Sequence, residues 1–413
     1  MNKIPENWIT YKISDLCDFQ NGYAFNSSDY VEEGMPIIRM SNISIDGNLN
    51  LTSENTKYYP REKAEILKKY VLNKNDVVMA MTDMTKDMGI IGKTAIIDED
   101  NKYLLNQRVG RLIIKNPKIL DYKYLHRYTN SPRFLDYAKQ HCSGGVQLNL
   151  STKAILNHKI ILPSTIEEQE EIAQVLDTMS DIIRLREECI SHAQELIPAL
   201  FQEMFGNPLK NKIPFKIGQF YNVGTGATPR RENESYYIGN NPWVKTTEVN
   251  NCYIEQTEEH ISDEAISKTN CTLYEPNTII MAMYGQGKTR GKVAYLKVSA
   301  TTNQACAALQ LKENYKDEIN NIFVFYYLQF IYNYLRTLSQ GGGRPNMNLS
   351  IVRNIPLYKP DIKLQNIFAN KALEIENYIK EQRDELENAR QMFQSLLHHA
   401  FTGELTRRAY VKD

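Results

Sequence analysis

The sequence predicts an α/β (α+β) protein with two similar globular domains of mixed sheets, separated by two long antiparallel coiled-coil-like helices about a pseudo-two-fold axis. Three observations lead to this prediction. A set of short motifs occurs twice in the same order. The segments that carry these motifs contain short apolar runs between turn residues, and two further segments lack glycine and place apolar residues at helical spacing.

The internal repeat sets the architecture. Five motifs return about 200 residues later in unchanged order, which defines a long internal period. The pairs are residues 77–81 with 279–283, 92–95 with 291–294, 106–107 with 303–304, 144–151 with 343–350, and Pro163 with Pro360. Each copy is expected to fold as one unit. Two similar units in one chain suit a target with two similar halves, as duplex DNA has.

The globular segments, residues 3–160 and 211–358, mix strand and helix patterns. Strands are predicted where β-branched runs stand between Asn, Gly and Asp, at residues 36–40, 77–81, 94–97 and 109–114. Helices are predicted at residues 123–140 and 322–338, and the second of these is rich in aromatic residues that should face a core.

Two long helices are predicted after the two globular segments, at residues 166–205 and 362–401, where apolar residues recur every three or four positions. Each helix would be about 58 Å long at 1.5 Å per residue, so each needs a partner along its apolar face. The other copy is the nearest candidate, and pseudo-two-fold symmetry would make the pair antiparallel. Pro198 removes the backbone hydrogen bond to Gln194, so a kink is expected near the end of the first helix.

Composition narrows the class of protein. A chain of 413 residues fits two or three cores. Its 49 basic residues balance 49 acidic ones, which counts mildly against a free-standing DNA-binding protein. The first residues form no apolar signal segment and no run is long enough to span a membrane, so a cytoplasmic location is expected. Six widely spaced cysteines without a CxxC pair are expected to be reduced.

Three tempting motifs are set aside. Residues 282–289 satisfy a relaxed P-loop pattern, but the following residues read as a strand, so a hairpin turn is favoured about nine to one on the context test for motifs. Residues 240–243 hint at the Asn-Pro-Pro-aromatic box of amino-methyltransferases, but the second proline and an upstream glycine-rich cofactor loop are missing. The seven histidines show no spacing with cysteines or carboxylates that matches a metal site, so no metal-binding residues are expected.

Further short motifs also point to a family. Each motif is weak by itself, but their order is specific because it occurs in both halves of the chain. They are Ile4-Pro5 with Trp8, residues 13–16, their weaker echo at 213–220, the loop 224–229 (Gly-Thr-Gly-Ala-Thr-Pro), residues 242–245 (Pro-Trp-Val-Lys), and residues 163–169 (Pro-Ser-Thr-Ile-Glu-Glu-Gln). Over essentially its whole length the chain resembles the specificity (S) subunit of type I restriction-modification systems. It departs from the pattern twice. Residues 21–25 replace the Gly-Thr-Gly loop in the first copy. The second long helix opens with residues 363–365 (Lys-Leu-Gln), without the glutamate that precedes the glutamine in the first copy.

The resemblance implies a domain organisation. It places target recognition domains at residues 1–165 and 208–361, long helical spacer and docking regions at 166–207 and 362–403, and a C-terminal tail at 404–413. Each domain would read one half of a bipartite DNA site, and the helix pair would set the unread gap between the halves.

The resemblance also implies partners and the division of chemistry among them. The chain would be non-catalytic and would bind double-stranded DNA, two copies of a modification (methyltransferase) subunit, and a restriction (translocase/endonuclease) subunit. It would direct adenine methylation and restriction by these partners. S-adenosylmethionine, ATP and Mg²⁺ would be held by the partner subunits, with no cofactor on this chain.

Candidate DNA-contacting residues lie at strand ends and in glycine-rich turns, where recognition side chains are usually found. Forked and amide side chains are favoured because Arg pairs with guanine, and Asn or Gln with adenine, in the major groove. In the first domain the candidates are Tyr23, Ser27, Arg39, Lys86, Lys93, Gln107, Arg108 and Gln147. In the second domain they are Thr228, Arg230, Arg231, Lys245, Tyr284, Lys288, Arg290, Asn303 and Arg344.

Two alternatives stay open. Any single basic candidate can be an ordinary solvated surface charge, and the pairs 106–107 and 303–304 can be structural amides that cap turns. At the level of function, the alternative is a repeat-built coiled-coil interaction scaffold without DNA binding, which the neutral net charge favours. The basic loops and the whole-chain resemblance favour the DNA specificity subunit.

Overall fold

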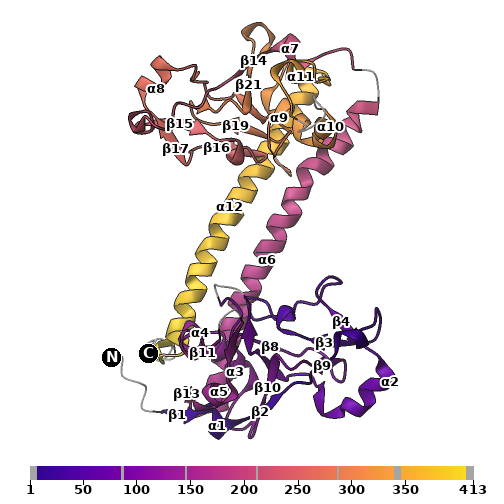
Figure 1. Cartoon of the computed structure of the whole chain (residues 1–413), viewed down its shortest axis with the longest axis vertical. Helices are drawn as coiled ribbons and strands as arrows, with labels where there is room; N and C mark the ends of the chain where they lie inside the picture. Colours follow the sequence, from indigo (N-terminus) through magenta and orange to yellow (C-terminus); the bar gives the residue numbers. More distant parts are fainter. Residues whose placement is uncertain are drawn as a thin grey trace, which may run out of the picture. The chain divides into compact units, whose positions relative to one another are not determined.

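The computed structural model describes residues 7–84, 88–144, 147–210, 213–285, 288–338 and 346–405. They form two compact units. Unit 1 contains Met1–Glu187 with Asp384–Asp413, and unit 2 contains Glu188–Arg383. Each unit holds the sheets and short helices of one repeat together with segments of both long helices (Figure 1).

Unit 1 contains a main antiparallel sheet in the order β2-β10-β6-β8 and a smaller sheet in the order β4-β3-β9-β5, in which β3 and β9 are parallel. The main strands are β2 (Cys17–Asn21), β6 (Val77–Ala80), β8 (Thr94–Ile96) and β10 (Val109–Ile114). The smaller sheet has β3 (Met35–Ile38), β4 (Lys57–Tyr59), β5 (Val71–Leu72) and β9 (Tyr103–Leu105). The remaining pairings involve β1 (Trp8–Lys12) with β13 (Lys159–Pro163), and β11 (Cys142–Ser143), β12 (Leu148–Leu150) and β7 (Thr82–Asp83).

Unit 2 repeats this topology with one more strand in the main sheet, β16, which is parallel to β19, and one strand fewer in the smaller sheet. Its main sheet has the order β14-β21-β18-β19-β16, and its smaller sheet has the order β17-β15-β20, in which β15 and β20 are parallel. The main strands are β14 (Tyr221–Thr225), β16 (Cys252–Ile254), β18 (Ile279–Ala282), β19 (Val293–Leu296) and β21 (Cys306–Leu311). The smaller sheet has β15 (Asn241–Val244), β17 (Glu259–Ile261) and β20 (Thr301–Thr302). The strand order therefore confirms the duplication that the motifs predict.

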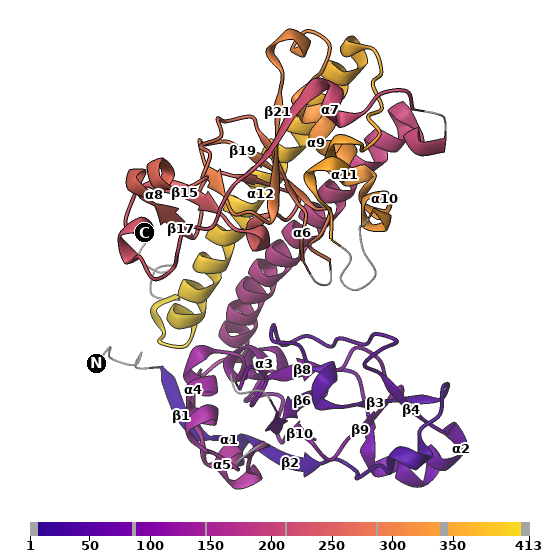
Figure 2. The same ribbon diagram turned by 45° about the horizontal axis from the view of Figure 1, so that its top comes forward.

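The helices of the two units also correspond. Unit 1 has α1 (Ile13–Leu16), α2 (Arg61–Ala64), α3 (Tyr122–Thr129), α4 (Pro132–Gln140) and α5 (Thr152–Asn157). Unit 2 has α7 (Ile217–Phe220), α8 (Asp263–Lys268), α9 (Asn321–Phe330), α10 (Tyr332–Thr337) and α11 (Leu349–Arg353). Figure 2 shows α3 next to β8, as it shows α9 next to the sheet of unit 2.

The predicted helix at residues 123–140 is divided in two. Its first part ends at Asn130, and Ser131 caps the second, which has Pro132 in its first turn. Proline has no backbone N–H and is favoured in the first turn of a helix, so the sequence begins a new helix there. The matching segment of unit 2 also divides, at Ile331, although no proline is present.

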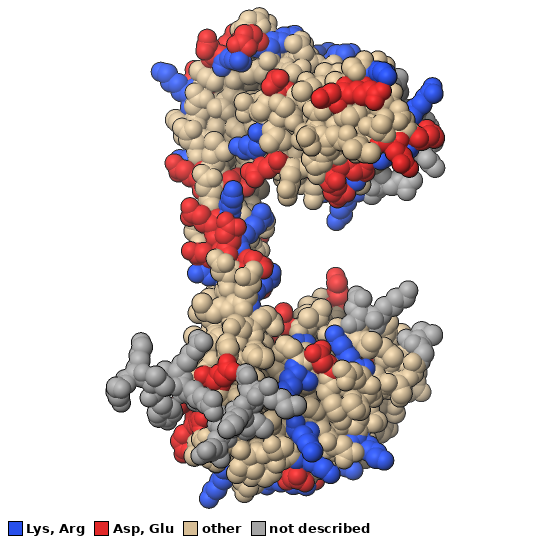
Figure 3. Space-filling view, turned by 90° about the vertical axis from the view of Figure 1, so that its left-hand side faces the viewer, with Lys and Arg blue, Asp and Glu red and all other residues tan. Residues whose placement is uncertain are grey.

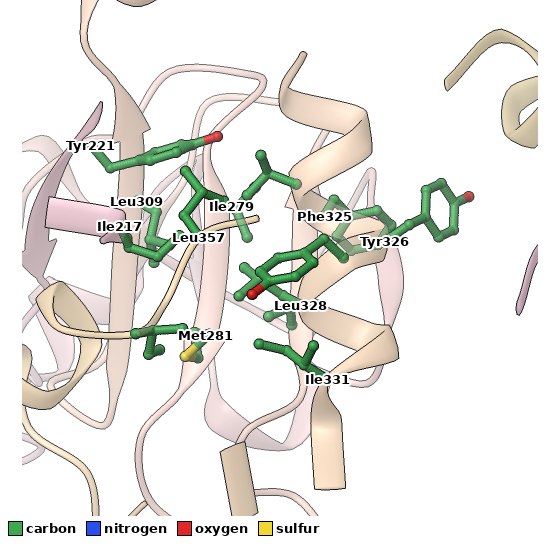
Figure 4. Packing of buried hydrophobic residues seen from close by; sticks show 14 of the residues in the cluster. Ile217, Tyr221, Ile279, Met281, Leu309, Phe325, Tyr326, Leu328, Ile331 and Leu357 are labelled. Carbon is green, nitrogen blue, oxygen red and sulfur yellow. The ribbon is translucent and has the colours of Figure 1, made fainter. Parts of the chain in front are cut away.

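A mixed sheet-and-helix core fills unit 2. Ile279 and Met281 of β18 and Leu309 of β21 are fully buried, and their side chains face the aromatic helix α9 (Figure 4). Alternate residues of a strand point to one face, so this spacing supplies one continuous apolar surface. Tyr326 points away from that sheet and donates a hydrogen bond to Glu376 at 2.9 Å. The helix α9 therefore joins the sheet to the second long helix.

The two long helices are α6 (Ile166–Phe205) and α12 (Ile362–Ala400), each with a segment in both units. In unit 1, Leu176 of α6 shares a core with Leu397 of α12, and further along Arg186 donates to Glu385. The two helices therefore run antiparallel in unit 1.

Unit 2 shows the same antiparallel pairing. The rings of Phe201 and Phe368 are 5.4 Å apart, while Gln194 and Lys380 line one cavity. Pro198 lies inside α6, which continues to Phe205. The prediction of a kink at Pro198 therefore stays a prediction.

A buried glutamine ties each long helix to its own domain. Gln169, in the first turn of α6, accepts a hydrogen bond from the Asp121 backbone N–H at 3.0 Å and donates to the carbonyls of Ile119 and Pro163. Its side chain is completely buried, so these bonds satisfy the whole amide.

Gln365 does the same in α12. It accepts from the Asn320 backbone N–H at 2.9 Å and donates to the carbonyls of Glu318 and Pro360 at 3.1 and 2.8 Å. The glutamate before Gln169 has a separate task, because Glu168 accepts from the Trp8 indole at 3.1 Å. The glutamine is thus the part of the Glu-Gln motif that both copies use.

Replacement of either glutamine by leucine should destabilise its own unit. Gln169→Leu removes three hydrogen bonds to backbone groups that are buried or partly buried, so we expect the free energy of unfolding of unit 1 to fall by about 3 kcal/mol. Gln365→Leu should do the same to unit 2. Urea unfolding followed by hydrogen exchange in each unit measures this, with the exposed neighbour Glu170→Leu as control. A loss no larger than the control's would contradict the assignment.

Unit 1 contains two buried histidines that unit 2 lacks. Burial, assisted by the charges of Arg127 and Lys93, lowers the pKa of His126 to about 3, and burial lowers the pKa of His158 to about 4. The ring nitrogen Nδ1 of His126 lies 3.2 Å from the Asn130 amide nitrogen. Because an amide nitrogen is a donor, Nδ1 must act as the acceptor, which requires the neutral form of the ring. Counting from the helix caps, Phe325 stands in unit 2 where His126 stands in unit 1.

Unit 1 should therefore be more sensitive to acid than unit 2. These histidine pKa values are lower in the folded than in the unfolded state. The free energy of unfolding of unit 1 is therefore highest above pH 6.5, the pKa of an unfolded histidine, and falls as the pH decreases below it. The slope approaches about 1.4 kcal/mol per pH unit for each histidine. Hydrogen exchange in the two units between pH 7.5 and 5, where carboxylates stay ionised, checks this. Equal losses in both units would refute it.

Candidate nucleic-acid interface

Four candidate residues of unit 1 lie at or beside the turn between β9 and β10: Tyr23, Arg39, Gln107 and Arg108. The backbone N–H of Asn106 donates to the Ile38 carbonyl at 3.2 Å, directly before Arg39. The backbone N–H of Gln107 donates to the Tyr23 carbonyl at 2.8 Å. These bonds bring the residues that follow β2 and β3 to a single turn.

Unit 2 builds the same arrangement between β20 and β21. The backbone N–H of Asn303 donates to the Val244 carbonyl at 3.1 Å, directly before Lys245. The hydroxyl of Thr228, which follows β14, donates to the side-chain oxygen of Gln304. Equivalent loops thus meet at equivalent turns in both units.

The two amides of each turn have different roles. Asn106 is buried, and its side-chain oxygen accepts the backbone N–H of Arg108 at 3.1 Å. Asn303 accepts the backbone N–H of Ala305 at 3.1 Å in the same way. The glutamine that follows each asparagine is exposed to solvent. The asparagines therefore cap the turns, and the glutamines are the amides presented at the surface.

The other candidates of unit 1 differ in exposure. The ring of Tyr23 packs against Phe25 and Tyr70 at 5.0 and 5.4 Å between ring centroids, whereas Ser27 is exposed. Lys93 is half-buried, and burial lowers the pKa of its ammonium group, although Asp46 nearby opposes the shift.

Two more candidates of unit 1 interact locally. The guanidinium of Arg108 lies 3.9 Å from the sulfur of Met84, and Gln147 donates to the side chain of Asn149 at 3.2 Å. Lys86 lies outside the described residues.

In unit 2, five candidates are exposed: Thr228, Arg230, Arg231, Tyr284 and Lys288. Arg290 is only 5% exposed, and its guanidinium donates to the Arg336 carbonyl at 2.7 Å. This contact fixes the start of β19 against α10, a packing role that the sequence did not reveal. Arg344 lies outside the described residues.

Arg231 and Lys245 share one carboxylate. Glu259 accepts from Arg231 at 2.5 Å and lies 3.1 Å from the Lys245 ammonium. The guanidinium of Arg231 also lies over the rings of Tyr237 and Trp243, at 4.3 and 5.1 Å. The hydrogen bond from Arg231 lowers the pKa of Glu259 against the smaller opposing effect of burial. The sequence analysis missed Glu259, because only strand pairing places it opposite Trp243.

The strands on either side of the P-loop-like string pair as the predicted hairpin requires. β18 pairs with β19 in antiparallel fashion across residues 283–292, so a strand follows where a P-loop would open a helix. All six cysteines are free thiols. Among the described residues, no three His, Cys, Asp or Glu side chains are grouped to hold a metal ion. No helix in the described part of the chain has both the length and the apolar character needed to cross a membrane.

The family model for the type I restriction modification DNA specificity domain matches this chain twice, at residues 5–193 and 210–388. The chain belongs to this family. The two matches correspond to the two repeats, and each includes a large part of the long helix that follows its sheets.

Two relatives from Methanocaldococcus jannaschii illustrate the range of similarity. The specificity subunit of type I restriction enzyme MjaVIII is 30% identical over 190 residues, which cover 45% of this chain and 42% of that protein. The putative type I restriction enzyme MjaX specificity subunit is 22% identical over 427 aligned positions, which cover 98% of this chain and 95% of that protein.

Solved structures share the fold. The S subunit of a type I restriction-modification system from M. genitalium has a TM-score of 0.61 at 16% identity, with 97% of each chain covered. A chain from a structural study of complex assembly and conformational transition in the type I R-M system has a TM-score of 0.62 at 14% identity. That alignment covers 97% of this chain and 99% of the other.

Substitutions should separate the two amides of each turn in this specificity-domain protein. Asn106→Ala and Asn303→Ala should each lower the free energy of unfolding of their unit by about 1 to 2 kcal/mol, because a backbone N–H loses its acceptor. Gln107→Ala should change it by less than about 0.5 kcal/mol, as expected for an exposed side chain. Urea unfolding of the four single variants, with Gln304→Ala as the fourth, gives the comparison. Losses of similar size at Asn106 and Gln107 would contradict the division of roles.

Proposed function

We propose that this chain is the non-catalytic DNA specificity subunit of a type I restriction-modification complex. Each domain would read one half of a bipartite DNA site. One observation carries the proposal: two domains of the same family and the same strand order each collect their loops around an equivalent turn. Two similar reading surfaces in one chain suit the two halves of one duplex site.

The exposed glutamines are the leading candidates for base recognition. Gln107 and Gln304 follow asparagines that cap the turns, so their amides are carried on a fixed backbone. A glutamine amide can bond an adenine through both N6 and N7 in the major groove. Exposed basic candidates such as Arg230 and Lys288 would contact phosphates and fix the position on the duplex without reading its sequence.

The long helices would serve as spacer and docking regions. In this proposal the target recognition domains are residues 1–165 and 208–361, and the helical regions are 166–207 and 362–403. On the face shown in Figure 3, acidic and basic side chains gather along the long helices. Exposed apolar side chains also lie on them, including Ile182 and Leu185 on α6 and Met392 on α12. Such a mixed surface suits a protein partner.

The chemistry would belong to the partners. Two copies of a modification subunit would dock on this chain and methylate adenine with S-adenosylmethionine, and a restriction subunit would join them with ATP and Mg²⁺. The assembled complex would work in the cytoplasm. A coiled-coil scaffold without DNA affinity is the alternative function, and it predicts no dependence of any methylation pattern on this chain.

A domain exchange tests the proposal. Residues 211–358 are replaced by the equivalent domain of a relative, and the chain is assembled with its modification subunits. Mapping of methylated adenines on exposed DNA should show one half-site changed and the other half-site and the gap retained, because each domain reads alone. A change in both half-sites would refute the modular assignment. Methylation that ignores the exchange would support the scaffold instead.

A further inference from the structure

The small sheets of the two units carry opposite charges at one matched position. In unit 1, β3 pairs with β4 so that Ile37 stands opposite Lys57. In unit 2, β15 pairs with β17 so that Trp243 stands opposite Glu259. Both strand pairs occupy the same place in their sheets, next to the parallel strand that leads to the candidate turn. A cation in one domain is thus an anion in the other.

The residue after each of these first strands also corresponds. Arg39 and Lys245 both precede a 3₁₀ turn, and the backbone N–H of each is capped by the side chain three residues later. In unit 1 that cap is the neutral Asn42, at 3.0 Å, and in unit 2 it is Glu248, at 2.7 Å. The surroundings of Lys245 are therefore more acidic than those of Arg39.

Two candidate cations of unit 2, Lys245 and Arg231, form ion pairs with carboxylates. Lys245 lies 2.6 Å from Glu258 and 3.1 Å from Glu259, and Glu259 also accepts from Arg231 at 2.5 Å. These hydrogen bonds, first from Glu258 and then from Glu259, raise the pKa of Lys245. The backbone of Lys245 adjoins the Asn303 turn, so the cluster belongs to the candidate interface.

Arg231 is also oriented by its neighbours. Its guanidinium stacks over Tyr237 and Trp243, and the carboxylate of Glu259 holds one edge of it. About half of the Arg231 side chain stays exposed, whereas about a quarter of Lys245 does. A guanidinium fixed in this way presents its remaining donors in one direction, as a base contact requires.

A carboxylate between two cations opposes binding to DNA phosphates. Affinity for phosphate arises mainly from release of the counterions around DNA, and it grows with the number of cations that are free to replace them. A cation that already faces a carboxylate contributes little until that carboxylate is displaced. Unit 1 has Lys57 at the position of Glu259 and lacks this opposition there.

We propose that Glu259 is a positioning residue that orients Arg231 and Lys245 for base contacts and suppresses sequence-independent phosphate binding by the second domain. The first domain, with Lys57 at the matched position, then supplies the larger share of phosphate affinity. The inference rests on the proposed DNA-reading function and assigns unequal electrostatic tasks to its two domains.

Glu259→Gln in the full chain, assembled with its modification subunit, tests the proposal. Binding to a mixed-sequence duplex without the recognition site is measured between about 50 and 300 mM salt. The Debye length is about 10 Å at 0.1 M salt, which lies within this range. We expect affinity at low salt to rise about three- to tenfold. The slope of log K against log salt should steepen by about 1 to 2, because one or two more phosphates are neutralised. Discrimination between specific and non-specific duplex should fall.

Control variants separate this role from a general change of charge. Glu264→Gln removes the same charge in the same domain from an exposed residue that pairs with Lys268, and it should leave the salt slope unchanged. Glu258→Gln, which frees one contact of Lys245 only, should act like Glu259→Gln but more weakly. Lys57→Glu should lower non-specific affinity and make the slope shallower by about 1.

The outcomes are distinct. Equal slopes for Glu259→Gln and Glu264→Gln, with duplex binding intact, would overturn the role of Glu259 and leave the proposed function standing. Absence of duplex binding in the unmodified complex and in every variant would overturn the proposed function itself. Because Glu258 is largely exposed, its variant keeps the test valid if Glu259→Gln impairs folding.

Discussion

The attachment of each sheet domain to the start of a long helix depends on one buried amide. Gln169 and Gln365 each accept one backbone N–H and donate to two carbonyls, and those backbone groups belong to the loop before a domain helix and to the segment before the long helix. A buried amide tolerates little displacement, because any lost bond leaves a polar group unpaired. The orientation of the helix start is therefore set by hydrogen-bond geometry as well as by apolar packing.

A second pair of equivalent bonds strengthens this junction. Tyr128 donates to the Lys159 carbonyl at 3.1 Å, and Tyr327 donates to the Pro356 carbonyl at 2.8 Å, each from the domain helix to the chain that leads into the long helix. These directional bonds at matched positions are thus common to the two copies. The candidate turns show the same pattern, because an asparagine caps each turn through a backbone N–H and the glutamine that follows it is exposed.

Periodicity predicted the long helices and the strand runs, because apolar spacing reports burial directly. It could not predict residue-to-residue equivalence. The matched string Asn-Leu-Ser aligns Ser151 with Ser350, yet the helix caps are Ser151 and Asn348, so the structure shifts this motif by two residues. Local similarity misled here because a serine and an asparagine cap a helix equally well. Burial of Arg290 was equally invisible, since its acceptor, the Arg336 carbonyl, is distant in the sequence.

The neutral net charge, which weighed against DNA binding, is a sum over the whole chain and does not show where charged residues are concentrated. Part of the acidic total stands in ion pairs between the long helices, such as Glu187 with Arg390, and part stands beside the candidate cations of unit 2. Phosphates at a binding surface respond to charges within about a Debye length, roughly 10 Å at 0.1 M salt, and hardly to the rest. Lys57 in one domain and Glu259 in the other then create different local fields in a chain whose total is zero. For a protein that must leave non-specific DNA to find its site, a low net charge, with two cations of one domain paired with carboxylates, favours selectivity over raw affinity.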